Sequence, residues 1–161
     1  MPQLVTADRL RAALLYDPLS GIFTWRIKPN RRIRIGSKAG TLTRGRIHIR
    51  LDGQIHRAHR LAWLYVNGHW PKREIDHRNG NASDNRIDNL RDVTHAVNTQ
   101  NQRRPHSRNI TGGLLGVSTT RSGKQYRARI DNRHLGVFET PERAHQAYIA
   151  AKRNHHEGGM L

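Results

Sequence analysis

Hydrophobic and polar positions at the start of the chain follow helical spacing. Leu10, Ala13 and Leu14 recur at i, i+3 and i+4 behind Thr6, whose hydroxyl can accept an amide of the first turn. This pattern predicts a short capped helix. We expect the helix to stop near Asp17-Pro18, because a proline disfavours helical backbone at the residue before it.

The pattern then changes to a period of two. Glycines separate short runs from residue 21 to 64, among them Ile-Phe-Thr-Trp at 22–25. The run at 46–51 alternates basic with apolar residues, which is typical of a strand with one buried and one basic face. An aromatic-rich run at 60–65 ends at the Asn67-Gly68 turn signal.

The densest polar stretch of the chain is residues 75–86. We predict a loop there, because so few apolar residues are not expected to form a core element. Residues 90–93 have the pattern of a short strand. Thr94 is placed to cap a helix running through Asn98 toward Gln102.

The last third of the chain predicts a separate small domain. Residues 102–113 have the composition of a flexible basic linker, and we place the domain boundary there. Runs at 116–120, 125–130 and 133–138, separated by turn signals, predict three strands. Thr140-Pro141 then opens a helix, with the threonine as cap and the proline as first residue. The expected unit is a three-stranded sheet packed on one helix.

The charge of the chain narrows the classes of partner. Its 161 residues carry 29 Lys plus Arg against 12 Asp plus Glu, a formal net charge of +17. A chain this basic favours a polyanion as partner, and a nucleic acid is the first choice. No apolar stretch is long enough to span a membrane, so we expect no membrane partner. Cysteine is absent, which excludes disulfides and thiolate zinc sites and favours a cytoplasmic protein.

Asp76 and His77 form the first candidate site. A carboxylate can hold a hard cation, and an imidazole that titrates near neutral pH can take a proton from an attacking water. An amide such as Asn89 could fix the imidazole by accepting from its other nitrogen. Taken alone, the two residues also fit an ordinary polar strand end with no catalytic duty.

A longer set of ordered motifs favours a catalytic role for Asp76 and His77 over the ordinary strand end. The chain from about residue 4 to 102 resembles the HNH endonucleases carried by phages and their mobile introns. The residues that carry the resemblance are Tyr16-Asp17-Pro18, Gly21-Ile22-Phe23-Thr24-Trp25, His59-Arg60-Leu61-Ala62-Trp63, Gly68-His69-Trp70-Pro71, Ile75-Asp76-His77-Arg78-Asn79-Gly80-Asn81, Asp84-Asn85-Arg86, Asn89-Leu90-Arg91, Val93-Thr94, Asn98 and Asn101.

The resemblance implies a ββα-metal (His-Me finger) nuclease core at about residues 72–102. In that family's scheme His77 is the general base and Asn89 orients and polarises its imidazole. Asp76 and Asn98 are the protein ligands of one divalent cation. The family's commonest third letter is His, whereas this chain has Asn98. Two oxygen donors favour Mg²⁺ or Mn²⁺ over zinc.

Further residues near this core are candidates for contact with the substrate. His95 lies three residues before Asn98 on the expected helix and is a candidate contact for the scissile phosphate. Arg86 and Arg91 are candidate phosphate clamps. His59, Trp63 and Trp70 are interpreted as scaffold.

A second candidate site is the basic face of the C-terminal sheet. Period-two alternation sets Tyr126, Ala128 and Ile130 on one face of a strand and basic residues on the other. Guanidinium groups in a row can pair with guanine or with phosphate in a major groove, although a solvated charged face is the ordinary interpretation of such a strand.

The segment 116–154 resembles the APETALA-type (ethylene-response-factor-like) DNA-binding domain. The similarity lies in Gly116-Val117, Gly123-Lys124, Tyr126-Arg127-Ala128, Leu135-Gly136, Phe138 and Thr140-Pro141-Glu142, with Tyr126 where that family usually has Trp. The resemblance implies that the sheet lies in the major groove. The candidate DNA contacts are Arg121, Lys124, Arg127, Arg129 and Arg133, and the expected core residues are Tyr126, Leu135, Phe138, Ala144 and Tyr148.

Together these observations predict an α+β protein with an HNH nuclease domain at 1–102, a basic linker at 103–113 and a DNA-binding domain at 114–155. The expected activity is homing-endonuclease-like hydrolysis of double-stranded DNA in the host cell of a phage. A single active site per chain favours a monomer that nicks, and double-strand cleavage would need a dimer or a second event. The alternatives are a non-catalytic DNA-binding protein and, less favoured, an RNA-binding protein, because no exposed aromatic pair is available to stack bases.

Overall fold

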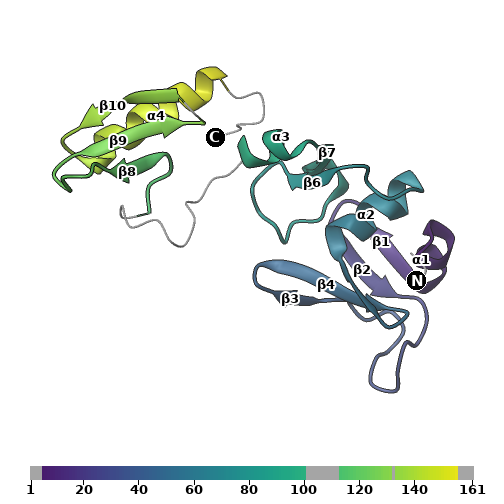
Figure 1. The fold of residues 1–161 in the computed structure, drawn as a ribbon. Helices are drawn as coiled ribbons and strands as arrows, with labels where there is room; N and C mark the ends of the chain where they lie inside the picture. The colour runs from purple at the N-terminus through teal and green to yellow at the C-terminus, as the bar shows by residue number, and fades with distance from the viewer. Residues whose placement is uncertain (1–4, 101–112, 132, 156–161) are drawn as a thin grey trace. The chain divides into compact units, whose positions relative to one another are not determined.

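The computed structural model describes residues 5–100, 113–131 and 133–155 (Figure 1). The chain divides into two compact units, Met1–His95 and Ala96–Leu161. The domain boundary expected at 102/103 stays a prediction, because the proposed linker, 103–113, lies outside the described residues except for Gly113.

The first unit begins with the predicted helix, which is shorter than expected. Helix α1 spans Ala7–Ala13, and the Thr6 hydroxyl accepts from the Arg9 amide at 3.2 Å, which confirms the cap. The expected end near Asp17 is wrong. Leu14–Asp17 forms strand β1, which pairs antiparallel with β2, Ile22–Trp25, and alternates buried with exposed side chains. Leu14 therefore belongs to strand β1 and not to the helix, because it pairs with β2.

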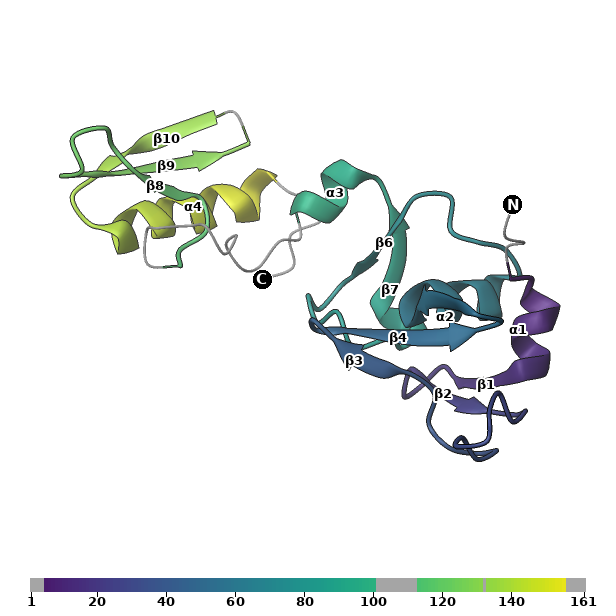
Figure 2. The same cartoon turned by 60° about the horizontal axis from the view of Figure 1, so that its bottom comes forward.

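Three short strands and a helix follow. Strands β3 (Thr41–Thr43), β4 (Arg46–Leu51) and β5 (Gln54–Arg57) form an antiparallel sheet in the order β3-β4-β5. Ile49 and Leu51 of β4 are buried, as the period-two pattern predicts. Helix α2, Ala58–Asn67, packs against this sheet in both views (Figures 1 and 2) and ends at Gly68, whose left-handed backbone closes its last turn.

The segment that carries the candidate site is a two-stranded antiparallel sheet. Strand β6 spans Glu74–His77 and pairs with β7, Leu90–Val93, after a loop and the 3₁₀ turn Ile87–Asn89. The loop predicted for 75–86 is therefore wrong at its start, because Ile75 is buried and β6 pairs along its whole length with β7. Helix α3, His95–Gln100, follows β7 as predicted.

One core holds the first unit together. It joins residues from α1, both N-terminal hairpin strands, β4, α2, β6 and β7. Its fully buried large side chains include Phe23, Leu10, Leu14, Ile49, Leu51, Leu61 and Leu64. Trp63 and Trp70 pack at its edge, in agreement with their interpretation as scaffold. The strand that carries Asp76 and His77 is thus anchored in the core through Ile75 and Leu90.

The second unit has the predicted sheet and helix. Strands β8 (Val117–Thr119), β9 (Tyr126–Ile130) and β10 (Arg133–Phe138) form an antiparallel sheet in the order β10-β9-β8, and helix α4, Pro141–His155, packs against all three. The Thr140 hydroxyl accepts from the Arg143 amide at 3.3 Å, which confirms the expected cap. Both units are therefore mixed α and β structures built from small antiparallel sheets. None of the helices in the described ranges is long and apolar enough to cross a membrane.

Candidate functional site

Asp76 and His77 lie at the end of β6, where the strand leads into the polar loop. Both side chains are buried, with relative exposures of 6% and 5%. Burial of a carboxylate and an imidazole is costly unless each has partners. Their burial therefore sets them apart from the polar residues of the loop, most of which are exposed.

The His77 imidazole is held by two groups from different parts of the fold. Its Nε2 lies 3.4 Å from Oδ1 of Asn85, and its ring meets the His59 ring of α2 edge-on, with centroids 5.1 Å apart. Burial lowers the pKa of His77 below its usual value, because the charged imidazolium loses its hydration. The imidazole is then neutral at physiological pH, which is the state that a general base needs.

The lowered pKa of His59 predicts that the stability of the protein depends on pH. Burial, reinforced by His77 and nearby arginines, lowers the pKa of His59 from 6.5 to about 3. Below pH 6.5 the His59 side chain is protonated in the unfolded state but stays neutral in the folded state. The free energy of unfolding therefore falls as the pH drops from 6.5 toward 3. At pH 5 this costs about 2 kcal/mol. In His59→Gln the loss of unfolding free energy between pH 7 and 5 should be smaller by that amount.

The readout for this comparison is tryptophan fluorescence in urea, because all three tryptophans (25, 63 and 70) lie in the first unit. The exposed His69 offers a matched control, and His69→Gln should lose as much stability as the parent. Equal losses in the parent and in His59→Gln would show that His59 is not the group responsible.

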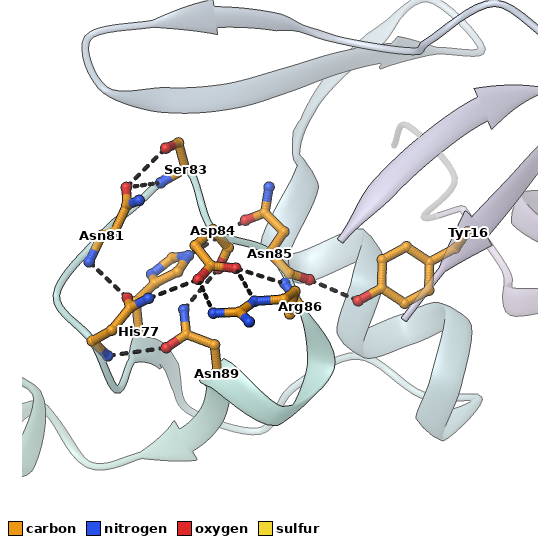
Figure 3. A network of polar contacts seen from close by, with 9 residues as sticks. Tyr16, His77, Asn81, Ser83, Asp84, Asn85, Arg86 and Asn89 are labelled. Carbon is orange, nitrogen blue, oxygen red and sulfur yellow. Dashed lines mark hydrogen bonds and ion pairs between the residues drawn. The ribbon is translucent and has the colours of Figure 1, made fainter. Parts of the chain in front are cut away.

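The Asn89 side chain makes two hydrogen bonds with the loop. Its Oδ1 accepts from the Asn79 amide at 3.0 Å and its Nδ2 donates to the Asp84 carbonyl at 2.8 Å (Figure 3). Both of these hydrogen bonds close the loop onto itself, and the role that the resemblance implies for Asn89, orienting and polarising the imidazole, stays a prediction. The group that contacts Nε2 is Asn85.

The loop is further fixed by Asp84. Its carboxylate accepts from Asn79 Nδ2 at 2.7 Å and makes two hydrogen bonds with the Arg86 guanidinium, at 2.7 and 2.9 Å. These bonds, that of Arg86 first, lower the pKa of Asp84 to about 2. Arg86, predicted as a phosphate clamp, is thus paired within the loop, although about half of its side chain stays exposed.

Arg91 is paired with the candidate metal ligand. Its Nε and a second guanidinium nitrogen lie 2.8 and 2.7 Å from Oδ2 of Asp76 across the β6–β7 pairing. Both side chains are largely buried, with exposures of 17% and 7%. The Arg91 guanidinium therefore fixes the direction of the Asp76 carboxylate, and the phosphate contact expected of Arg91 stays a prediction.

Two candidate site residues, His95 and Asn98, lie on α3. His95 is exposed, and its Nδ1 lies 2.8 Å from Oε1 of Glu74 on β6. Asn98 is half-buried on α3 and falls in the second compact unit. Its place as a partner of Asp76 therefore stays a prediction. No group of three or more His, Cys, Asp or Glu side chains in the described part of the chain is arranged to hold a metal ion.

The basic face of the second unit has the predicted alternation. Ala128 and Ile130 are buried, Tyr126 packs beside the core, and Arg129 between them is exposed. Arg121, Lys124 and Arg133 are also exposed, and Arg127 is half-buried. The proposed DNA contacts therefore include four exposed cations in strands β9 and β10 and in the turn before β9.

Two residues at the site had no functional role in the sequence interpretation. The sequence interprets His59 as scaffold and assigns Asn85 no role beyond its place in the polar loop. Both are buried beside His77, with exposures of 3% and 1%. Asn85 carries no separate signal, because its burial depends on Tyr16, which lies 69 residues earlier in the chain.

Comparison with known proteins supports the nuclease interpretation of this segment. The family model of the HNH endonucleases matches residues 56–100, the segment from the end of β5 to the end of α3. The match includes Asp76, His77, Asn89 and Asn98. No curated protein and no solved structure matches the chain at the threshold applied.

Proposed function

We propose that the protein is a metal-dependent endonuclease that hydrolyses phosphodiester bonds in double-stranded DNA. The observation that carries the proposal is the buried imidazole of His77, adjacent in the chain to the buried carboxylate of Asp76, inside the segment that matches the HNH endonucleases. A carboxylate and a neutral imidazole are the two groups that water activation beside a hard cation requires.

In the proposed reaction His77 accepts a proton from the water that attacks the phosphorus. Its lowered pKa keeps it unprotonated at neutral pH, so the base is available before substrate binds. Hydrogen bonds among Asn89, Asp84 and Asn79 fix the loop that follows His77. Asn89 thus positions this loop, and with it the base.

The residues present fit a small, hard cation. The residues proposed to hold it, Asp76 and Asn98, would supply one carboxylate and one amide oxygen, and Mg²⁺ is usually bound by few protein oxygens together with waters and substrate phosphate. A cation held there would neutralise charge that develops on the phosphate during attack. Arg91 holds Oδ2 of Asp76 in a fixed direction, which orients the carboxylate for this role. The same donor set also accommodates Mn²⁺.

The second unit supplies a basic sheet face suited to duplex DNA. Arg127 and Arg129 alternate along β9 and so share one face of the sheet, where cations can pair with phosphates and guanine edges. With an APETALA-type sheet in this role, the protein is a homing-like nuclease that selects its site through the C-terminal unit. His95 contributes a contact to the scissile phosphate, and the chain acts as a monomer in the cytoplasm of a phage host.

The test of the proposal is cleavage of supercoiled plasmid by the full chain. With Mg²⁺ we expect conversion to nicked circles, and with chelator in place of the ion no conversion, while binding to the same DNA in a mobility-shift assay persists. Binding without cleavage at any Mg²⁺ or Mn²⁺ concentration would support the non-catalytic DNA-binding protein instead. Preference for RNA over duplex DNA at matched salt would contradict both.

A further inference from the structure

Asn85 stands out because it is buried within a loop of largely exposed polar residues. We propose that Asn85 is a positioning residue that sets the tautomer of the His77 imidazole, and that the β1–β2 hairpin holds Asn85 in place. The inference rests on the proposed role of His77 as general base. It also assigns a catalytic purpose to a hairpin outside the segment 56–100 that matches the nuclease family.

The side-chain amide of Asn85 is only partly hydrogen-bonded. The side chain is 1% exposed, its Oδ1 lies 3.4 Å from Nε2 of His77, and its Nδ2 is buried without a hydrogen-bond partner. A buried polar atom left unpaired destabilises a protein by about 1–3 kcal/mol. A residue kept at such a cost is a candidate for a functional rather than a structural role.

The backbone of Asn85 is clamped by the hairpin. The Tyr16 hydroxyl of β1 donates to the Asn85 carbonyl at 2.7 Å (Figure 3). Gly21, in the turn between β1 and β2, has φ +71, and a Cβ on it would lie 2.5 Å from the Asn85 carbonyl carbon. The turn can approach this closely only because residue 21 has no side chain.

Tyr16 is itself immobilised. Its ring is 4% exposed and contacts Phe23 and Tyr65, with centroid distances of 4.7 and 5.6 Å. Its hydroxyl therefore reaches the loop from a fixed place in the core. The path from the core to the imidazole runs through Tyr16, the Asn85 backbone and the Asn85 amide.

The orientation of the amide decides which imidazole nitrogen acts as the base. An amide oxygen only accepts, so Oδ1 facing Nε2 requires the hydrogen on Nε2 and the lone pair on Nδ1. The reverse tautomer would direct the lone pair at Nε2 toward the buried Asn85, where it cannot accept a proton from water. The His59 ring packs edge-on against the imidazole and so restricts its rotation.

The test measures the tautomer separately from activity. In the ¹⁵N-labelled full chain without added metal, long-range ¹H–¹⁵N correlations should report the Nε2–H tautomer for His77. Asn85→Leu, which removes the acceptor but fills the space, should give a mixture of tautomers and a cleavage rate lower by at least about tenfold, since a general base in the wrong tautomer loses up to about 10⁴-fold. Asn85→Asp keeps an oxygen at Nε2 and should keep the parent tautomer.

Two variants complete the design. Tyr16→Phe removes only the hydroxyl and should shift the tautomer balance in the same direction as Asn85→Leu, by less, so it decides the question if Asn85→Leu does not fold. Asn81→Ala changes an exposed amide of the same loop and should match the parent in both readouts. The Nδ1–H tautomer in the parent, or the parent tautomer in Asn85→Leu or Tyr16→Phe, overturns the inference. The predicted tautomers in a chain that never cuts DNA would overturn the proposed function and leave the positioning intact.

Discussion

His77→Ala should cut supercoiled DNA at least about 10²-fold more slowly than the parent in Mg²⁺, and up to about 10⁴-fold more slowly. The imidazole is the group that takes the proton from water, and burial keeps it neutral at pH 7. No described side chain next to it can replace this function, because the pKa of His59 near 3 reflects a ring too buried to accept a proton. The measurement is the single-turnover rate of plasmid nicking at saturating protein.

The control for this variant is His69→Ala, since His69 is an exposed histidine whose Nδ1 faces only the neighbouring Trp70 carbonyl. It should cut at the parent rate. Because His77 is buried, circular dichroism and DNA affinity of His77→Ala should be compared with the parent to separate lost chemistry from lost folding. A folded His77→Ala that binds DNA and cuts at the parent rate would rule out His77 as the base.

The elements that periodicity predicts correctly are mostly those whose apolar residues are buried and whose polar residues are exposed. In β4 Ile49 and Leu51 are buried and Arg50 is exposed, and in β9 Ala128 and Ile130 are buried and Arg129 is exposed, so the pattern of both strands is visible in the sequence. Helix α2 received no assignment, although Ala58, Leu61, Ala62 and Tyr65 have the spacing of one helical face. There the signal was present and the aromatic content of the run obscured it.

Strand β6 shows where such reasoning fails for a physical reason. Its Asp76 and His77 are buried although they are polar, because Arg91 and Asn85 compensate them from other elements. A rule that places polar residues outside predicts a loop at such a site, and its failure is expected where function requires buried polar groups. The identity of His77 and Asp76 as candidates came from the motif, whereas their partners depend on long-range pairing that one sequence does not reveal.

Arg91 and Arg86 illustrate the same limit. Both were predicted as phosphate clamps because both follow the motif closely in the sequence. In the structure one pairs with the buried Asp76 and the other with the loop residue Asp84. The burial of the two pairs differs, so the two arginines should respond differently to removal.

Arg91→Ala should lower the free energy of unfolding of the first unit by about 3 kcal/mol or more, because it removes the guanidinium from a carboxylate that is 7% exposed. Arg86→Ala, whose side chain is 52% exposed, should lower it by much less, because solvent screens the pair. Tryptophan fluorescence in urea measures both. Arg91→Ala should also cut DNA more slowly, since Asp76 loses its orienting partner, while its DNA affinity changes little. Two results would instead support Arg91 as a phosphate clamp. One is an equal loss of stability in the two variants, and the other is a loss of DNA affinity in Arg91→Ala as large as its loss of cleavage rate.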